Sequence, residues 1–361
     1  MGIFSQAGDF ILEAHGNGGK LTHELIAEVF AAGFKNETLN EGLDSAVMNI
    51  GSMLESVKAK SLADCGETLA EARLALTTDS YVVSPLFFNG GDIGKLAVTG
   101  TLNDLLVCGA VPCAITCGFI IEEGFKISEL KKIVSSMAET AAKNGVSIVT
   151  GDTKVVGRGR CDGVYINTAG AGLVINGADL KPANIKAGDA VIITGVPGNH
   201  GICILNERGG YVDKNSVRSD CAPLSKPLIS LMNKVKDIKV MRDPTRGGVA
   251  TTLNEFVKQN GEIGIELLEN SIEYDKNSKA LADILGIDLL YSACEGRALI
   301  ICSKESADEA LNELKKFEET AGAKVIGYAC AKNKGRVIIK TSVGGARILD
   351  MQVLEQFPRI C

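Results

Sequence analysis

The sequence predicts two domains of mixed α/β (α+β) class, and three observations support this. Its 361 residues are enough for two domains of ordinary size, each with its own core. Segments with strand and helix patterns follow one another without strict alternation, which favours sheets covered on one side by helices. A polar stretch punctuated by Pro and Gly, 176–188, is the best candidate for a linker. We therefore expect an N-terminal domain at 1–175, a C-terminal domain at 176–345 and a mobile tail at 346–361.

Apolar periodicity and turn residues predict the elements of the N-terminal domain. A helix beginning at Ile93 has apolar residues at helical spacing, among them Leu96 and Leu102, and glycine and proline stop it. The expected elements are a strand at 74–83, this helix up to Gly109, a strand at 113–121, a helix at 128–144, and strands at 146–149 and 164–175.

The same criteria predict the C-terminal domain. We expect strands at 190–194, 263–268, 298–302, 324–329 and 336–341, helices near Gly201, Pro223 and Val249, and a helix opened by a capping box at 306–309. No regular element is expected from Ala346 on, and Gly344 with Gly345 is a candidate hinge. Sixteen extended residues reach on the order of 50 Å, enough to bring Cys361 into its own or a neighbouring subunit.

Composition excludes several classes of function. Thirty-eight Lys and Arg against 44 Asp and Glu give a net charge of −6, and no basic run is interleaved with aromatics, so we expect no nucleic-acid partner. No signal pattern or bilayer-length apolar run is present, so we expect a cytoplasmic protein without a membrane partner. The 11 cysteines are expected to be reduced. The cluster Cys108, Cys113 and Cys117 lacks a further ligand at metal spacing, which argues against a metal site there.

Carboxylates recur at strand ends or beside glycines. Gathered in one cleft, they would hold Mg²⁺ between themselves and phosphate oxygens, because Mg²⁺ prefers hard oxygen ligands. Each one alone is more often a turn residue than a ligand. The residues are Asp79, Asp92, Asp104, Asp152 and Asp243.

Glycine-rich segments would supply backbone N–H groups to the phosphates. One segment, 15–20, contains Gly18, Gly19 and Lys20, but it lacks P-loop spacing and is also compatible with a flexible loop. Another, 246–248, enters a helix, whose N-terminus would add its dipole.

Four further residues are candidates for chemistry. Lys154 follows a strand and Gly151, where an ammonium would bind phosphate or move a proton, with a surface lysine as the alternative. Glu295 is a candidate general base, with an ion pair to Arg297 as the alternative. His200 is more simply a turn or helix-cap residue. The last residue, Cys361, is a candidate nucleophile that Arg359 would help to ionise, with an inert exposed thiol as the alternative.

Six segments together resemble the HypE family of hydrogenase maturation factors. The resemblance covers nearly the whole chain. Aminoimidazole ribonucleotide synthetase and selenophosphate synthetase share several of the motifs, whereas the Cys-terminated tail is particular to HypE. The segments are 77–86, 90–97, 100–104, 150–156, 243–248 and 358–361.

This resemblance implies a homodimer formed through the N-terminal sheets, with ATP and Mg²⁺ as cofactors and the glycine-rich N-terminus closing over phosphate. It implies that the carbamoyltransferase HypF places a carboxamide on the sulfur of Cys361. ATP then activates the carboxamide oxygen, and dehydration leaves a thiocyanate. The cyano group passes to the HypC–HypD complex on its way to the iron of a [NiFe]-hydrogenase.

The resemblance also assigns roles to residues. It implies that Mg²⁺ is held by Asp79, Asp104 and Asp243. The residues implied near the nucleotide are Gly18, Gly19, Lys20, Asp79, Asp92, Asn103, Asp104, Gly151, Asp152 and Thr153. Lys154 and Glu295 would face the tail, and we favour Glu295 as the base because an unshifted lysine is already protonated at neutral pH. The sequence departs from the family at Cys294, where Asn is expected, which puts the geometry around Glu295 in doubt.

Other functions remain open at this point. Selenophosphate synthesis is disfavoured because the glycine-rich N-terminal loop has no reactive Cys, and purine synthesis would not need the Cys361 tail. A non-catalytic carrier that binds nucleotide and shuttles a group on Cys361 is the alternative outside the enzymes.

Overall fold

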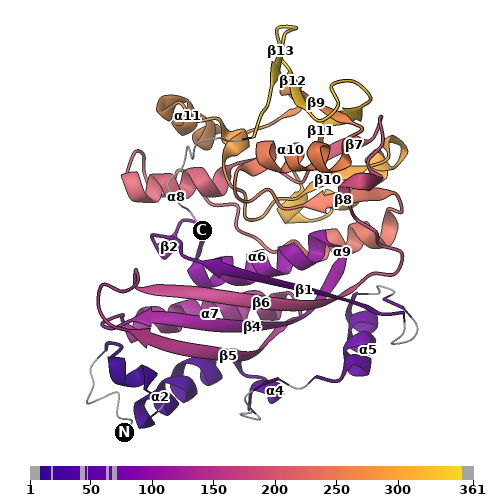
Figure 1. Ribbon diagram of the computed structural model, residues 1–361. Helices are drawn as coiled ribbons and strands as arrows, with labels where there is room; N and C mark the ends of the chain where they lie inside the picture. Colours follow the sequence, from indigo (N-terminus) through magenta and orange to yellow (C-terminus); the bar gives the residue numbers. More distant parts are fainter. Residues whose placement is uncertain are drawn as a thin grey trace.

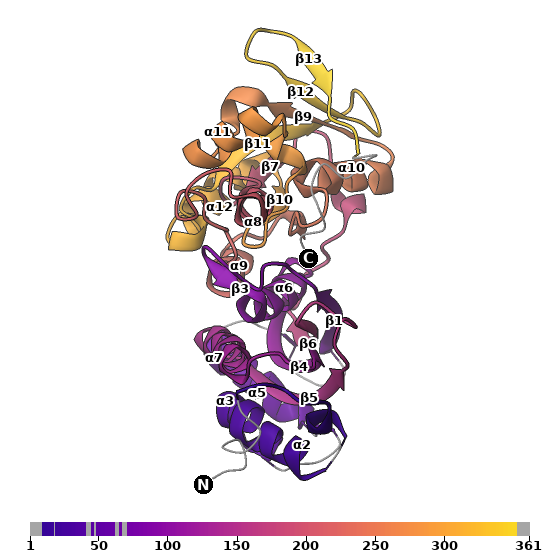
Figure 2. The same cartoon turned by 90° about the vertical axis from the view of Figure 1, so that its left-hand side faces the viewer.

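The computed structural model describes residues 9–17, 19–40, 45–46, 48–61, 65–66 and 71–351. The N-terminal and C-terminal domains are stacked one above the other (Figures 1 and 2). Among the described residues, no helix combines the length and the apolar content that crossing a bilayer requires.

The N-terminal domain is built on a four-stranded sheet. Its order is β1 (Arg73–Tyr81), β6 (Val164–Val174), β4 (Ala110–Glu122) and β5 (Ser147–Val156). Only β4 and β5 are parallel. Two helices, α6 (Ile93–Val107) and α7 (Ile127–Lys143), lie behind the sheet in the view of Figure 1. The shorter elements are η1 (Glu13–Gly16), α2 (Lys20–Leu25), η2 (Ile26–Ala31), α3 (Ala32–Phe34), α4 (Glu37–Asn40), α5 (Ile50–Ser61), β2 (Phe87–Phe88) and β3 (Gly91–Asp92).

Helix α6 packs between the N-terminal sheet and the C-terminal domain. Asp92 caps it by accepting hydrogen bonds from the N–H groups of Gly94 (2.7 Å) and Lys95 (3.1 Å). Nearly all its residues are buried, because the sheet covers one side and the C-terminal domain covers the other (Figure 2). Leu96 of α6 and Leu228 of α9 belong to one continuous apolar cluster that spans both domains.

The C-terminal domain has a seven-stranded sheet in the order β13, β12, β9, β11, β7, β10, β8. The strands are β7 (Ala190–Ile193), β8 (Ile238–Arg242), β9 (Gly264–Leu268), β10 (Leu299–Cys302), β11 (Lys324–Cys330), β12 (Val337–Lys340) and β13 (Ala346–Ile348). The helices are α8 (Asn199–Gly209), α9 (Ser225–Lys234), α10 (Gly248–Asn260), α11 (Lys276–Leu285) and α12 (Ala307–Leu314). Short helical turns are η3 (Pro182–Asn184), η4 (Glu269–Ser271), η5 (Leu289–Tyr291), η6 (Lys304–Ser306) and η7 (Glu318–Thr320).

This second sheet is covered on both faces, which corrects the expectation of one-sided sheets. Ala190 and Ile192 of β7 pack in the cluster that contains α9 and α12, whereas Val191 and Ile193 pack in the cluster of α10. Every residue of β7 is buried. An unbroken apolar strand of this kind is typical of a sheet buried on both sides.

Three local predictions also differ from the structure. The segment 150–154, expected to follow a strand, is the continuation of β5. Ser306 makes no capping hydrogen bond, because η6 already winds the chain helically before α12 begins. The tail is ordered at its start, because β13 pairs with β12 and 343–345 is the turn between them.

Candidate active site

Four of the predicted acidic residues gather where the domains meet. Asp79 lies near the end of β1, Asp104 lies in the last turn of α6, Asp243 follows β8 and Glu295 precedes β10. In addition to burial, the carboxylates of Asp79 and Asp104 help to raise the pKa of Asp243 and of Glu295. The pKa of Asp243 is raised to about 7, first by burial and then by the Asp104 carboxylate.

Glu295 is the most deeply buried of the four. Only 4% of its surface is exposed, and its pKa lies well above the usual range, first because of burial and then because of Asp243 and further carboxylates. Its predicted ion pair with Arg297 is absent from the described contacts, since Arg297 lies beside Asp220 instead. A buried carboxyl held neutral beside other acids is suited to exchange a proton.

Asp104 is fixed by a neighbour across the sheet. Thr77 of β1 donates a hydrogen bond of 2.7 Å to its Oδ2. Burial raises the pKa of Asp104, while this hydrogen bond opposes the shift. The described residues contain no preassembled group of three or more His, Cys, Asp or Glu that could hold a metal ion. Coordination of Mg²⁺ by Asp79, Asp104 and Asp243 therefore stays a prediction.

Asn103 braces the wall of this cluster. Its Nδ2 donates to the carbonyl oxygens of Ala222 (3.3 Å) and Glu295 (3.4 Å), and its Oδ1 accepts from the Leu224 N–H (2.9 Å). Asn103 thus ties α6 to the loop that carries Glu295. Contact of Asn103 and of the capping residue Asp92 with a nucleotide stays a prediction.

The turn after Asp243 packs against the same loop. Gly247 and Gly248 have φ of +74° and +59°, which glycine adopts readily. A Cβ on Gly248 would lie 2.6 Å from the carbonyl oxygens of Leu290 and Ser292. The sequence therefore needs glycine there for the start of α10 to approach the segment leading to Glu295. Phosphate binding at this helix start remains untested.

Two other predicted residues, Asp152 and Lys154, lie along β5, at the edge of the N-terminal sheet opposite to β1. Asp152 and Lys154 form an exposed ion pair with 3.9 Å between Nζ and Oδ2. Register places Asp152 beside Gly118, Asn167 and Ser80 on the open face of the sheet.

Asp79 belongs to the opposite face. It pairs with Thr168, whose hydroxyl contacts Thr101 of α6 at 2.6 Å. One chain therefore does not place Lys154 beside Glu295.

The remaining predicted residues are distributed as follows. Gly151 is required by packing, since a Cβ would lie 2.5 Å from the Cys117 carbonyl oxygen, and Thr153 continues β5. Gly19 and Lys20 begin α2, where Lys20 is exposed. Gly18 and Cys361 lie outside the described residues.

Cys294 fits the position where the resemblance predicts Asn. Its Sγ accepts a hydrogen bond from the Gly198 N–H (3.1 Å) and lies 3.9 Å from the Ser292 carbonyl oxygen. The thiol therefore occupies a position with one donor and one acceptor, which an amide would satisfy more strongly.

Two further residues lie near the cluster. His200 has a structural role, and Asp220 was missed by the sequence analysis. His200 is buried in α8 and contacts the Ser219 hydroxyl at 2.9 Å, as a structural residue would. Asp220, which the sequence analysis did not single out, is buried beside Glu295 and Arg297. Its only sequence signal is an Asp shortly before Pro223, which reads as a turn.

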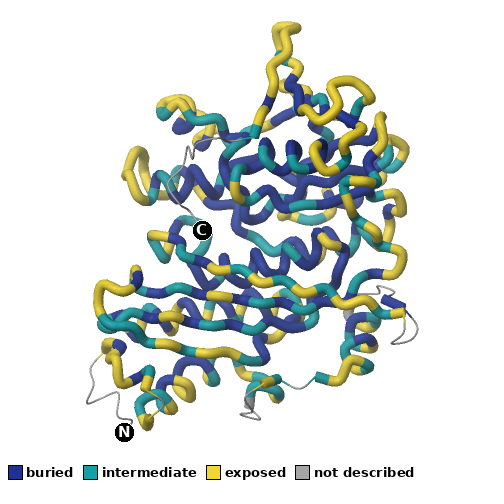
Figure 3. Tube along the Cα trace, viewed as in Figure 1, coloured by how far each residue is buried: buried dark blue, intermediate teal, exposed yellow. Residues whose placement is uncertain are grey.

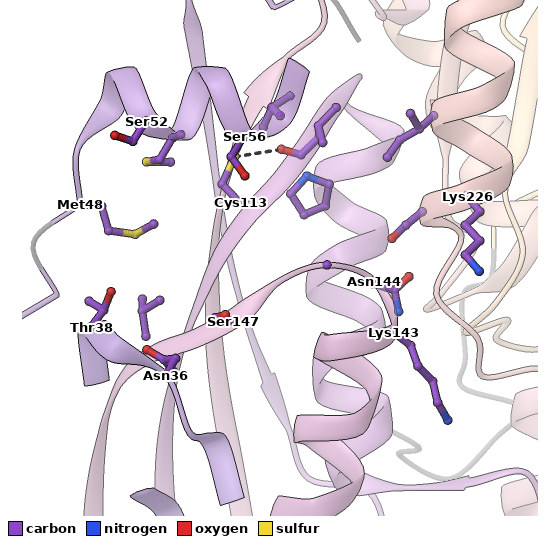
Figure 4. Close-up of a pocket in the computed structure, with 18 of the residues that line it drawn as sticks. Asn36, Thr38, Met48, Ser52, Ser56, Cys113, Lys143, Asn144, Ser147 and Lys226 are labelled. Carbon is purple, nitrogen blue, oxygen red and sulfur yellow. Dashed lines mark hydrogen bonds between the residues drawn. The ribbon is translucent and has the colours of Figure 1, made fainter. Parts of the chain in front are cut away.

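A large cavity of about 1260 Å³ lies away from this cluster. It is enclosed by α5, the end of α7 and α9, and its wall includes Ser56, Cys113, Asn144 and Lys226 (Figure 4). None of the predicted site residues that the structure describes lines it. This cavity is therefore separate from the predicted site.

Comparison with known proteins defines the class of this fold and site. Residues 62–174 match the family model "AIR synthase related protein, N-terminal domain", and residues 186–340 match the corresponding C-terminal domain. The chain is thus a two-domain protein related to AIR synthase.

Closer relatives identify the family. A carbamoyl dehydratase HypE from Rhodobacter capsulatus is 43% identical over 348 residues, covering 96% of this chain and 97% of that protein. A crystal structure of HypE in complex with ATP has a TM-score of 0.87 at 40% identity, covering 97% of this chain and 99% of the other. The HypE chain of a HypE–HypF complex has a TM-score of 0.75 at 40% identity, covering 92% and 100%. The chain belongs to the HypE family.

Proposed function

We propose that this chain is an ATP-dependent carbamoyl dehydratase of [NiFe]-hydrogenase maturation. The observation that carries the proposal is its 43% identity, over nearly the full length of both chains, to a protein of that name. The substrate is a carboxamide on the Cys361 sulfur. ATP phosphorylates the carboxamide oxygen, the C–O bond breaks as phosphate leaves, and both N–H protons depart, so that S–C(=O)NH₂ becomes S–C≡N with net loss of one water.

The acidic cluster supports a nucleotide site that also needs a cation. A polyphosphate cannot approach several buried carboxylates unless positive charge lies between them. Asp79, Asp104 and Asp243 provide the hard oxygen donors that suit Mg²⁺. A bound cation would also favour the ionised forms of Asp104 and Asp243, whose pKa values are raised. The similarity to a HypE structure in complex with ATP supports the nucleotide itself.

Glu295 is proposed as the base that takes an amide proton. Its burial excludes bulk water, and its raised pKa makes its carboxylate a stronger base than that of an ordinary glutamate. Lys154 is proposed as the cationic partner that stabilises negative charge developing on the activated oxygen. The raised pKa of Glu295 supports its role as the base. The exposure of Lys154 on an open face of the sheet makes it accessible as the cationic partner.

The proposed partners follow from the family. The HypE–HypF complex supports HypF as the donor of the carboxamide. We propose the HypC–HypD complex as the acceptor of the cyano group.

A homodimer through the N-terminal sheet is proposed because one face of that sheet carries exposed apolar side chains. Leu74, Leu76 and Ile120 are 57%, 73% and 43% exposed, and the strand register puts them on the face of Lys154. Figure 3 shows exposed positions along the strands of this sheet. An exposed apolar face of a sheet is typical of a protein interface. Pairing of two such faces would place Lys154 within the dimer interface.

We expect Leu76→Asp to disrupt this dimer. A two-fold interface contains the substitution twice, and loss of about 2 kcal/mol at an apolar anchor weakens association about 30-fold or more. Sedimentation would measure the dissociation constant. The matched control is Ile284→Asp on α11, at a side chain 77% exposed, which should leave the dissociation constant unchanged. Equal self-association of wild type and Leu76→Asp would contradict the proposed interface.

Mass spectrometry of the C-terminal peptide tests the activity. Cys361 is first carbamoylated by the partner transferase, and Mg-ATP is then added. We expect the peptide to lose the mass of one water only when ATP is present. A carbamoyl group that persists in protein shown to bind ATP would favour the carrier, in which a partner performs the chemistry.

A further inference from the structure

We infer that Asp220 is a positioning residue for Glu295, holding the backbone at Glu295 and the side chain of Arg297 in a fixed relation at the domain junction. This inference rests on the proposed function and adds to it a residue that acts through Glu295. Asp220 belongs to the segment 219–224, which is hydrogen-bonded to the segment 294–297 at the domain junction.

The carboxylate of Asp220 contacts both ends of the Glu295 segment. Its Oδ1 accepts a hydrogen bond of 3.1 Å from the Glu295 N–H, and its Oδ2 lies 3.7 Å from Nε of Arg297. The main chains of the two segments are also in close contact, because a Cβ on Gly296 would clash with the Asp220 carbonyl oxygen. The segment carrying the proposed base is therefore held against Asp220 by main chain and side chain together.

Arg297 extends this contact to the rest of the domain. It donates hydrogen bonds to the carbonyl oxygens of Val196 (3.3 Å) and Glu319 (2.8 Å). On the other side, Asn103 of α6 bonds to both Ala222 and Glu295. Asp220 is thus the charged member of a network that fixes Glu295 between α6 and the C-terminal sheet.

Keeping a carboxylate here opposes folding, which argues for a role beyond packing. The Asp220 side chain is fully buried, and burial raises its pKa although Arg297 and the backbone N–H groups of Glu295 and His200 oppose that shift. A buried charge that its partners do not fully compensate is destabilising, and residues of this kind concentrate at functional sites. An apolar residue of similar size would pack without this cost but would release the Glu295 N–H and Arg297.

The inference predicts a defect in rate without a defect in nucleotide binding. We expect Asp220→Ala to lower the rate of S-cyano-Cys361 formation at saturating Mg-ATP by about 10- to 100-fold, because small displacements of a reacting group cost this much. The KM for Mg-ATP should stay within about threefold of wild type, which corresponds to less than a tenfold change in affinity. Asp220→Asn keeps an acceptor for the Glu295 N–H and should recover part of the rate.

A matched buried carboxylate separates positioning from general destabilisation. Asp189 is 5% exposed and accepts a 2.7 Å hydrogen bond from the Lys186 N–H, away from the junction. Asp189→Ala should reduce thermal stability while the rate of the folded protein stays at the wild-type value. A comparable loss of rate in Asp189→Ala, or a wild-type rate in folded Asp220→Ala, would overturn the inference.

Amide hydrogen exchange gives a readout that does not depend on activity. Exchange at the peptide containing Glu295 should be faster in Asp220→Ala than in wild type and unchanged in Asp189→Ala. If wild-type protein fails to dehydrate carbamoylated Cys361, the proposed function falls, while exchange still decides whether Asp220 holds Glu295. If Asp220→Ala does not fold, Asp220→Asn decides: a lowered rate at unchanged KM supports the inference, and a wild-type rate overturns it.

Discussion

Replacing Cys361 with alanine is expected to abolish formation of the S-cyano product while nucleotide binding stays nearly intact. The thiol is the only atom group proposed to carry the carboxamide, so its removal leaves no substrate on the protein. The acidic cluster lies within the described body of the protein, so ATP should still bind. The measurements are the mass of the C-terminal peptide after incubation with the transferase and Mg-ATP, and the dissociation constant of Mg-ATP.

The control for this substitution is another accessible thiol. Cys330 in β11 is partly exposed and contacts the Lys332 carbonyl oxygen. Cys330→Ala should leave both product and ATP affinity at wild-type values. Product formed by Cys361→Ala would show that a different residue carries the carboxamide, and loss of ATP binding would show that the tail is part of the nucleotide site.

Sequence patterns predicted the local elements of this fold well because those elements follow from local chemistry. Helix α6 begins at Asp92, whose side chain caps it, and α7 places Leu130, Ile133 and Val134 on its buried face. Four acidic residues at the ends of such elements, or just beyond them, were candidates from the sequence, and β1, α6, β8 and the segment before β10 bring them together. Their roles stay predictions. The assignment of the chain to the HypE family confirms the resemblance stated on sequence alone.

The features that escaped prediction depend on pairing between distant segments. Whether Lys154 shares a face with Asp79 is decided by the register of three strand pairs, which no single segment encodes. The ordered start of the tail depends on β12, and on Asn254, whose Nδ2 donates a 2.8 Å hydrogen bond to the Leu349 carbonyl oxygen. Asp220 becomes notable only once its segment is seen packed against Glu295.

Glu295→Gln is expected to lower the dehydration rate by about 100-fold or more, the usual contribution of a general base. Glutamine keeps the size and most of the hydrogen-bonding capacity of the side chain but cannot accept the amide proton. In wild type the rate should rise with pH until Glu295 ionises, at a pH above the usual glutamate range because burial and the neighbouring carboxylates raise its pKa. In Glu295→Gln this limb should disappear.

The same substitution should increase stability at neutral and higher pH when metal and nucleotide are absent. The pKa of Glu295 is higher in the folded than in the unfolded protein, so its contribution to stability is full below the unfolded value and is lost as pH rises through the folded value. Glutamine removes that loss.

Glu313→Gln is a control of opposite sign. Lys316 lowers the pKa of Glu313, so its stabilisation is present above the usual value and is lost as pH falls through the folded value. Urea unfolding across a pH series, in the presence of a chelator, would measure both variants. A Glu295→Gln protein that loses stability as pH rises with the wild-type slope would show that the pKa of Glu295 is not raised in the folded protein, and the predicted rise of the rate with pH would then need another cause.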